Sequence, residues 1–154
     1  MISVKSVINK IRESGLTISF AESCSGGSIA AEIIKISGVS DIFKGGVITY
    51  SDQVKIDILK VPKQEIQKYG VVSENIAFLM AKNSKELFKT SLSLATTGNI
   101  GPLSSDDRSK VGEIYICLIY HEKVLHKKLN LKASRVENIN KLVFEAFSLM
   151  DTVL

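Results

Sequence analysis

The sequence predicts a single domain of the α/β class, in which a mixed five-stranded sheet lies between two layers of helices. Apolar runs of strand length alternate along the chain with segments whose apolar residues recur at helical spacing. Towards the C-terminus, two strand-like segments follow one another across a short turn, which predicts a hairpin and hence one antiparallel strand. The 154 residues are enough for one domain with a buried core.

The first half of the chain alternates between helical and strand-like segments. Gly15 ends the first helix, whose apolar residues recur at helical spacing, and Gly38 follows the end of the second helix. Ser51 is a typical N-cap residue, and Pro62 suits the first turn of a short helix. The expected elements are a helix over 4–11, a strand over 16–21, a helix over 27–36, a strand over 45–50, a helix from 52 through 59, and a helix over 62–69.

The second half of the chain predicts two helices and three strands. Ser73 is the expected N-cap of a long helix, and β-branched and apolar residues fill the strand that follows it. The expected elements are a helix over 74–87, a strand over 92–97, hairpin strands over 113–120 and 123–131, and a closing helix over 134–150.

The composition is that of a globular protein, with 45% apolar and 23% charged residues. The chain has no run of about 18 apolar residues, which a membrane-spanning helix needs, and charges near its start argue against a signal peptide. Cys24 and Cys117 lie in different elements without metal-ligand spacing, and His121 and His126 flank the hairpin turn as solvated residues. We therefore expect a cytoplasmic protein with reduced thiols, no metal and no membrane partner.

The net charge of +4 is mild, and the lysines are scattered over the chain. Nucleic-acid-binding proteins usually have clustered basic residues with interleaved aromatic residues or a known motif. The sequence has neither feature, so we expect no nucleic-acid partner.

Three loops that follow strands, at 22–28, 50–55 and 97–102, carry most of the reactive side chains. If the three strands are parallel, these loops meet at one edge of the sheet, where ligands bind in open α/β folds. The polar segment 103–110 is expected to be a mobile loop near this site.

The reactive groups in these loops suggest nucleophilic catalysis. Ser23 and Ser25 are both candidate nucleophiles, and a serine hydroxyl needs a base to take its proton. No histidine is near these loops, so the candidate base is Lys55. Its expected place in the first turns of a helix, together with partial burial, would lower its pKa. Tyr50 is expected to relay a proton or to orient the substrate. The alternative is structural: a surface lysine, a strand-end aromatic residue and a turn-forming serine.

Two glycine-containing loops suit an anionic ligand. Gly26 and Gly27 allow close approach of the backbone, and the N–H groups of the following helix can bind an anion, with Ser25 as a further donor. The loop 98–101 is a second candidate, although it also fits a plain turn before a proline. Arg135, at the start of the last helix, either binds a phosphate or is simply exposed.

The segment Ala21-Glu22-Ser23-Cys24-Ser25-Gly26-Gly27 resembles the AESCTGG signature of the CinA C-terminal domain family, the nicotinamide-nucleotide amidases of the PncC type. The resemblance spans nearly the whole chain in the right order, so we expect 1–154 to form one domain of this family. Further similar segments are Ser37–Ser40, Phe43–Gly46, Thr49–Ser51 with Lys55, Gly70–Glu74, Met80-Ala81, Thr97–Pro102 and Val111-Gly112.

The resemblance implies a single α/β/α domain that deamidates nicotinamide mononucleotide without a metal or cofactor and associates as a homodimer. It assigns Ser23 as the nucleophile, Lys55 as its base and Tyr50 as an assisting residue. It also implies a set of substrate-binding and phosphate-binding residues: Cys24, Ser25, Gly26, Gly27, Thr97, Gly98, Asn99, Gly101 and Arg135.

The chain departs from the family pattern on the substrate side of the site. Asn99-Ile100 replaces Ile-Ala, Leu103-Ser104-Ser105 replaces a glycine pair, and Lys110 stands in place of a proline. A second arginine of the last helix is replaced by Ile139 or Asn140. A nucleotide-binding module without useful turnover is therefore the second hypothesis. A nucleic-acid-associated role, suggested by the basic isoelectric point and the competence-linked family name, is the third.

Overall fold

The computed structural model describes residues 2–154 and has a central five-stranded sheet in the order β2-β1-β3-β4-β5. Strands β1, β2 and β3 are parallel, whereas β4 is antiparallel to both of its neighbours. The predicted mixed sheet with one antiparallel strand is therefore confirmed. The strands are β1 (Ile18–Glu22), β2 (Phe43–Ile48), β3 (Leu92–Gly98), β4 (Glu113–Tyr120) and β5 (Lys123–Asn130).

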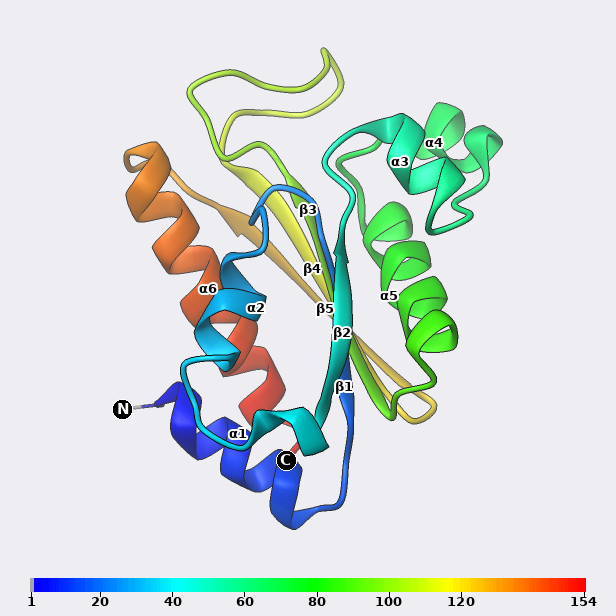
Figure 1. Cartoon of the computed structure of the whole chain (residues 1–154). Helices are drawn as coiled ribbons and strands as arrows, with labels where there is room; N and C mark the ends of the chain where they lie inside the picture. Colours follow the sequence, from blue (N-terminus) through cyan, green and yellow to red (C-terminus); the bar gives the residue numbers. More distant parts are fainter. Residues whose placement is uncertain (1) are drawn as a thin grey trace.

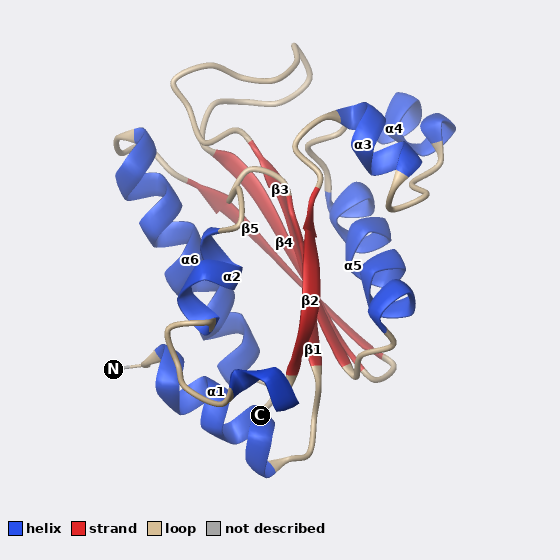
Figure 2. Cartoon of the chain, in the orientation of Figure 1, coloured by secondary structure: helices blue, strands red, loops and turns tan. Residues whose placement is uncertain are grey.

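Helices cover both faces of the sheet, so the predicted three-layer arrangement is also confirmed (Figures 1 and 2). One layer contains α1 (Val4–Glu13), α2 (Ser28–Ile33) and α6 (Arg135–Asp151), and the other contains α3 (Asp52–Asp57), α4 (Lys63–Tyr69) and α5 (Glu74–Phe88). A short 3-10 helix, Val39–Asp41, precedes β2. Within residues 2–154, no helix is both long enough and apolar enough to cross a membrane.

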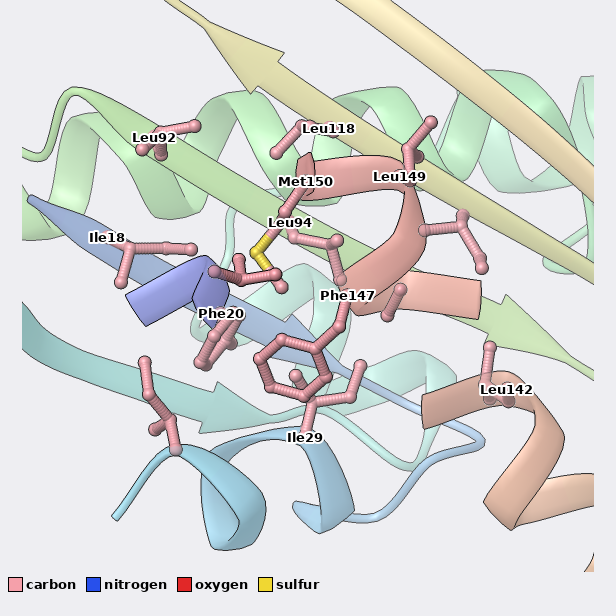
Figure 3. Close-up of a cluster of buried hydrophobic side chains, with 14 of the residues drawn as sticks. Ile18, Phe20, Ile29, Leu92, Leu94, Leu118, Leu142, Phe147, Leu149 and Met150 are labelled. Atoms are coloured by element: carbon pink, nitrogen blue, oxygen red, sulfur yellow. The ribbon is translucent and has the colours of Figure 1, made fainter. Parts of the chain in front are cut away.

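The larger part of the core lies between the sheet and the layer of α1, α2 and α6. Phe20 of β1 and Phe147 of α6 are fully or almost fully buried there, among the side chains that Figure 3 shows. A second cluster, which includes Met80 of α5, fills the space on the other face. All five residues of β1 are buried, as expected for a strand covered on both faces. Burial of each large apolar side chain stabilises the fold by about 1.5–3 kcal/mol.

Several boundaries differ from the sequence prediction by two or three residues, and two of these differences have a clear local reason. Helix α2 ends at Ile33 rather than near Ile36, because the N–H groups of Lys35 and Ile36 bond to the carbonyl oxygen three residues back instead of four. The chain then turns at Gly38, which has a positive φ of 75°. Strand β2 begins at Phe43 rather than at Gly45. A bulge lets Lys44 lie between the residues paired with Ile18 and Ser19, and an extra residue of this kind disrupts the alternation on which strand prediction depends.

Candidate active site

The loops after β1, β2 and β3 meet at one edge of the sheet, at the top of Figure 1. Glu22 at the end of β1 pairs with Ile48 of β2 on one side and with Thr96 of β3 on the other. Because the three strands are parallel, their C-terminal ends deliver their loops to the same place. The prediction of a shared edge is therefore confirmed.

Ser23 and Lys55, which come from two of these loops, contact each other directly. Lys55 Nζ donates a hydrogen bond of 3.1 Å to Ser23 Oγ and one of 2.8 Å to the carbonyl oxygen of Thr49. Ser51 begins α3 as its N-cap, with Oγ accepting from the N–H of Val54, and so directs Lys55 back towards β1. The site thus brings a hydroxyl and an amine within proton-transfer distance.

Burial is the main influence on the pKa of Lys55. Its side chain is 1% exposed, which excludes the alternative of a surface lysine. Loss of solvation lowers the pKa of the Lys55 amine, while the nearby Asp52 carboxylate and Cys24 act in the opposite direction. A lowered pKa favours the neutral amine, the form that can accept a proton from Ser23.

Tyr50 and Arg135 form a second contact at the rim of the site. Arg135 Nη2 donates to the hydroxyl of Tyr50 at 3.0 Å, and Arg135 Nη1 donates to the carbonyl oxygen of Gly101 at 2.6 Å. Tyr50 is 61% exposed, whereas Lys55 is buried. The arginine therefore joins the loop after β2 to the loop after β3, and the proton of the Tyr50 hydroxyl remains available to a ligand.

A cavity of about 220 Å³ opens beside these residues. Its wall includes the catalytic candidates Ser23, Tyr50 and Lys55, together with Cys24, Asp52, Thr97, Gly98, Asn99 and Arg135. The segment Leu103–Ser105 also lines the cavity. Within residues 2–154, no group of three or more His, Cys, Asp or Glu side chains is placed to hold a metal ion.

The turn at 25–27 has a different role from the one expected. The sequence predicts that the N–H groups at the start of α2 bind a phosphate, but the Glu22 carboxylate accepts hydrogen bonds from Gly27, Ile29 and Ala30 at 2.9–3.1 Å. Ser25 Oγ is bonded to Thr96 Oγ1 at 2.7 Å and is buried. The residues lining the cavity do not include Ser25, Gly26 or Gly27. In this structure these groups build the turn and do not face the ligand space.

Asn99 holds the segment 103–110 in place. Its Oδ1 accepts from the N–H of Ser105 at 2.8 Å, and its Nδ2 donates to Ser109 Oγ at 2.8 Å and to the carbonyl oxygen of Lys110 at 3.0 Å. These bonds use both the oxygen and the nitrogen of the Asn99 side-chain amide. The presence of Asn99 in place of the isoleucine of the family pattern is therefore explained by loop structure rather than by a new ligand contact.

The other residues of the second glycine-containing loop also make structural contacts. Thr97 Oγ1 donates to the carbonyl oxygen of Val71 at 2.8 Å, which ties β3 to the segment before α5, and both residues line the cavity. A Cβ at Gly98 would lie 2.7 Å from backbone atoms of β4, so only glycine fits there. Gly101 has a positive φ of 99°, which glycine adopts readily.

Neither cysteine is reactive in this structure. Burial raises the pKa of Cys24 to about 12 and that of Cys117 to about 12, so both thiols are protonated at neutral pH. Both are free, and Cys117 lies in the core as predicted. Cys24 lies in the wall of the cavity next to Ser23, where it acts as a small apolar surface.

Sequence reasoning assigned no role to Glu22 or to the Thr49 carbonyl group. A signal for Glu22 was present, since an acidic residue close to the start of a helix is favoured by the helix dipole. The position of the Thr49 carbonyl group has no signal in the sequence, because every residue has one.

Residues 2–154 match the family model described as the CinA C-terminal domain. The chain is 36% identical over 140 residues to a CinA-like protein of Flavobacterium psychrophilum, covering 91% of this chain and 34% of that protein. It is 36% identical over 154 residues to a CinA-like protein of Thermosipho melanesiensis, covering 99% of this chain and 38% of that protein. The chain thus spans little more than a third of the length of these relatives.

Solved structures have the same fold. The competence/damage inducible protein CihA from Agrobacterium tumefaciens is similar with a TM-score of 0.92 at 28% identity, over 97% of this chain and 92% of that chain. A competence-damaged protein (CinA) superfamily protein from Escherichia coli has a TM-score of 0.93 at 23% identity, over 99% of this chain and 91% of that chain. At 23% identity, the similarity to the Escherichia coli protein concerns the fold alone.

Proposed function

This chain belongs to the CinA C-terminal domain family, and on that premise we propose that it is an amidohydrolase that converts nicotinamide mononucleotide into nicotinate mononucleotide and ammonia. The observation that carries the proposal is the 3.1 Å contact between Ser23 Oγ and the buried Lys55 Nζ beside an open cavity. The substrate is inferred from the family resemblance, and the anionic end of that substrate suits a site with Arg135 at its rim.

The reaction proceeds through a covalent intermediate. Neutral Lys55 takes the proton of Ser23 as Ser23 Oγ attacks the carboxamide carbon, and a tetrahedral oxyanion forms. Lys55 then gives this proton to the departing nitrogen, the C–N bond breaks, and ammonia leaves an acyl ester on Ser23. Water attacks the ester with Lys55 again as the base, and the carboxylic acid product and free Ser23 are restored. The Thr49 carbonyl group holds the Lys55 amine in place during both halves of the reaction.

The turn after Ser23 also offers a donor for the oxyanion. Within residues 2–154, the backbone N–H group of Cys24 donates to no other residue, and Cys24 lines the cavity. The N–H group directly after a nucleophile is a frequent part of an oxyanion hole. Donors of this kind contribute about 10²–10³ in kcat.

Tyr50 and Arg135 are assigned to the part of the substrate nearer to solvent. The hydrogen bonds of Arg135 to Gly101 and Tyr50 use two of the five N–H donors of its guanidinium group, which leaves donors for a phosphate. The hydroxyl of Tyr50 is held by Arg135 and can donate its own proton to the substrate.

Ammonia release from nicotinamide mononucleotide tests the proposal. We expect Ser23→Ala to lower kcat by about 10³ or more. Ser25→Ala is the matched control, because it removes the neighbouring candidate hydroxyl, and we expect its kcat to stay within about tenfold of wild type. If Ser23→Ala releases ammonia as fast as wild type, the proposed function is wrong. If Ser25→Ala alone abolishes release, Ser25 is the nucleophile instead.

The second candidate is a nucleotide-binding module without turnover. The hydrogen bonds that tie Asn99 to the segment 103–110 favour it, because they occupy groups that a flexible glycine-rich loop would offer to a ligand. Tight binding of the mononucleotide in calorimetry without ammonia release supports this candidate, and measurable Ser23-dependent release excludes it.

We also propose a cytoplasmic location, a homodimer and no nucleic-acid partner. Several lysines on and near β5 are paired with glutamates: Lys127 and Lys141 both contact Glu145, and Lys128 contacts Glu113. This pairing reduces the positive charge that a phosphate backbone would need. Sedimentation tests the dimer, and a steeply salt-dependent affinity for DNA would contradict the last assignment.

A further inference from the structure

The Glu22 side chain is buried at the end of β1, directly before the turn 23–26 that contains Ser23. It is 1% exposed, and its carboxylate accepts three backbone hydrogen bonds. Oε2 accepts from Gly27 at 3.0 Å and from Ile29 at 3.1 Å, and Oε1 accepts from Ala30 at 2.9 Å. A buried carboxylate persists only when such donors surround it.

These bonds replace the side-chain cap that α2 lacks. Gly27 is the N-cap residue of α2 and offers no side chain, so the first N–H groups of the helix would otherwise be without acceptors. Glu22 supplies those acceptors from five positions before Gly27. The segment 23–26, which contains the nucleophile, is therefore held at both of its ends.

The backbone of Glu22 is connected to the proposed base by a short series of hydrogen bonds. The N–H of Thr49 donates to the carbonyl oxygen of Glu22 at 2.8 Å, and the carbonyl oxygen of Thr49 accepts from Lys55 Nζ at 2.8 Å. Lys55 Nζ also donates to Ser23 Oγ, and the N–H of Ser23 donates to the carbonyl oxygen of Thr96 at 3.1 Å. Glu22 directly precedes the nucleophile Ser23, and its hydrogen bonds connect it to Thr49, which contacts the base Lys55, and to the start of α2.

We propose that Glu22 is a positioning residue of this active site. Its carboxylate fixes the 23–26 turn so that Ser23 Oγ stays beside Lys55 and the N–H group of Cys24 stays available to the oxyanion. This inference rests on the proposed function, because it assigns Glu22 an effect on the reactivity of Ser23. The three N–H groups at the start of α2 serve this purpose and are not a phosphate site.

Glu22→Gln tests the inference in the full chain. The amide has the size of the carboxylate but presents an NH₂ donor to backbone N–H groups that are themselves donors. We expect kcat for nicotinamide mononucleotide to fall by about 10–100-fold, with KM changed by less than about threefold, as for a small displacement of reacting groups. The labelling rate of Ser23 by a fluorophosphonate, followed by mass spectrometry, is expected to fall by a similar factor and does not depend on the choice of amide substrate.

Ser91→Ala is the matched control. Ser91 Oγ accepts from the N–H of Thr17 at 2.7 Å and donates to the carbonyl oxygen of Thr17 at 3.1 Å. Ser91 thus joins the residue before β1 to the residue before β3, at the other end of these strands from Glu22. It is expected to lower the melting temperature while leaving kcat and labelling unchanged. If Glu22→Gln does not fold, Glu22→Asp retains the charge at a shorter reach, and its expected loss of kcat and labelling is in the same direction.

The outcomes separate this inference from the proposed function. If the Glu22 variant that folds reacts and labels within about twofold of wild type, Glu22 is only structural and the inference is overturned. If wild-type Ser23 labels and the label depends on Glu22 but no ammonia is released, the amidase proposal fails and the positioning role stands. If wild-type Ser23 does not label at all, both are overturned.

Discussion

Lys55→Met separates the chemical role of the buried amine from its effect on stability. Methionine fills nearly the same volume but has no amine, so both bonds of Nζ, at 3.1 Å to Ser23 Oγ and 2.8 Å to the Thr49 carbonyl oxygen, are lost. Removal of a general base usually costs about 10²–10⁴ in rate. We expect a fall of about 10³ in kcat, which corresponds to about 4 kcal/mol of transition-state stabilisation.

The stability of the same variant is expected to change little, because two effects oppose each other. Leaving the Thr49 carbonyl group without a partner costs about 1–3 kcal/mol. Replacing a desolvated charge by an apolar side chain gains about 1–4 kcal/mol. The net change in the free energy of unfolding then lies between a loss of about 2 kcal/mol and a gain of about 3 kcal/mol, so the melting temperature should not fall by more than about 8 °C.

The pH dependence gives an independent check. Since burial lowers the pKa of Lys55, kcat/KM should rise with pH as the amine loses its proton, with a midpoint below 10.5. The unfolded chain binds more protons than the folded chain between the lowered pKa and 10.5, so stability should rise with pH in that window. Lys55→Met should remove both effects.

Ammonia release and thermal unfolding measured on the same preparations provide the assay. Lys60→Met is the matched control, since Lys60 follows the same helix but is exposed, and it should retain wild-type activity. Retention of more than about a tenth of the activity by Lys55→Met would refute its role as the base. A fall of more than about 15 °C in melting temperature would refute the argument that its burial is unfavourable to the charged form.

Three further predictions concern the walls of the cavity. Asn99→Ala should destabilise the protein by about 1–3 kcal/mol and speed hydrogen exchange in 103–110, because three hydrogen bonds of that segment are lost; unchanged exchange would contradict the role given to Asn99. Arg135→Lys should raise KM for nicotinamide mononucleotide by about tenfold, with a smaller effect on nicotinamide riboside, which lacks the phosphate; equal effects on the two substrates would exclude a phosphate contact. With pKa values of about 12, Cys24 and Cys117 should resist iodoacetamide in the folded protein at neutral pH and react after denaturation. Rapid alkylation of the folded protein would show that the two thiols are accessible rather than buried.

The order of the elements could be read from the sequence because it depends on local periodicity. Apolar residues at helical or alternating spacing must face a core, and this requirement located the helices and strands to within a few residues. The meeting of Ser23 and Lys55 was also predictable. Each follows a strand, and parallel strands in one sheet deliver their following loops to the same edge.

Other features depend on groups that meet only in the folded chain. The free N–H groups at the start of α2 predict an anion, and the sequence could not show that the anion is the Glu22 carboxylate of the same chain. Asn99 is compatible with a ligand contact until the loop that occupies its amide is placed. The sequence by itself determined the elements and the edge at which the reactive groups gather, because periodicity and strand direction are local or topological properties. Only the tertiary structure decided which donor meets which acceptor, because hydrogen bonds between distant segments depend on distances of a few tenths of an ångström that no local pattern records.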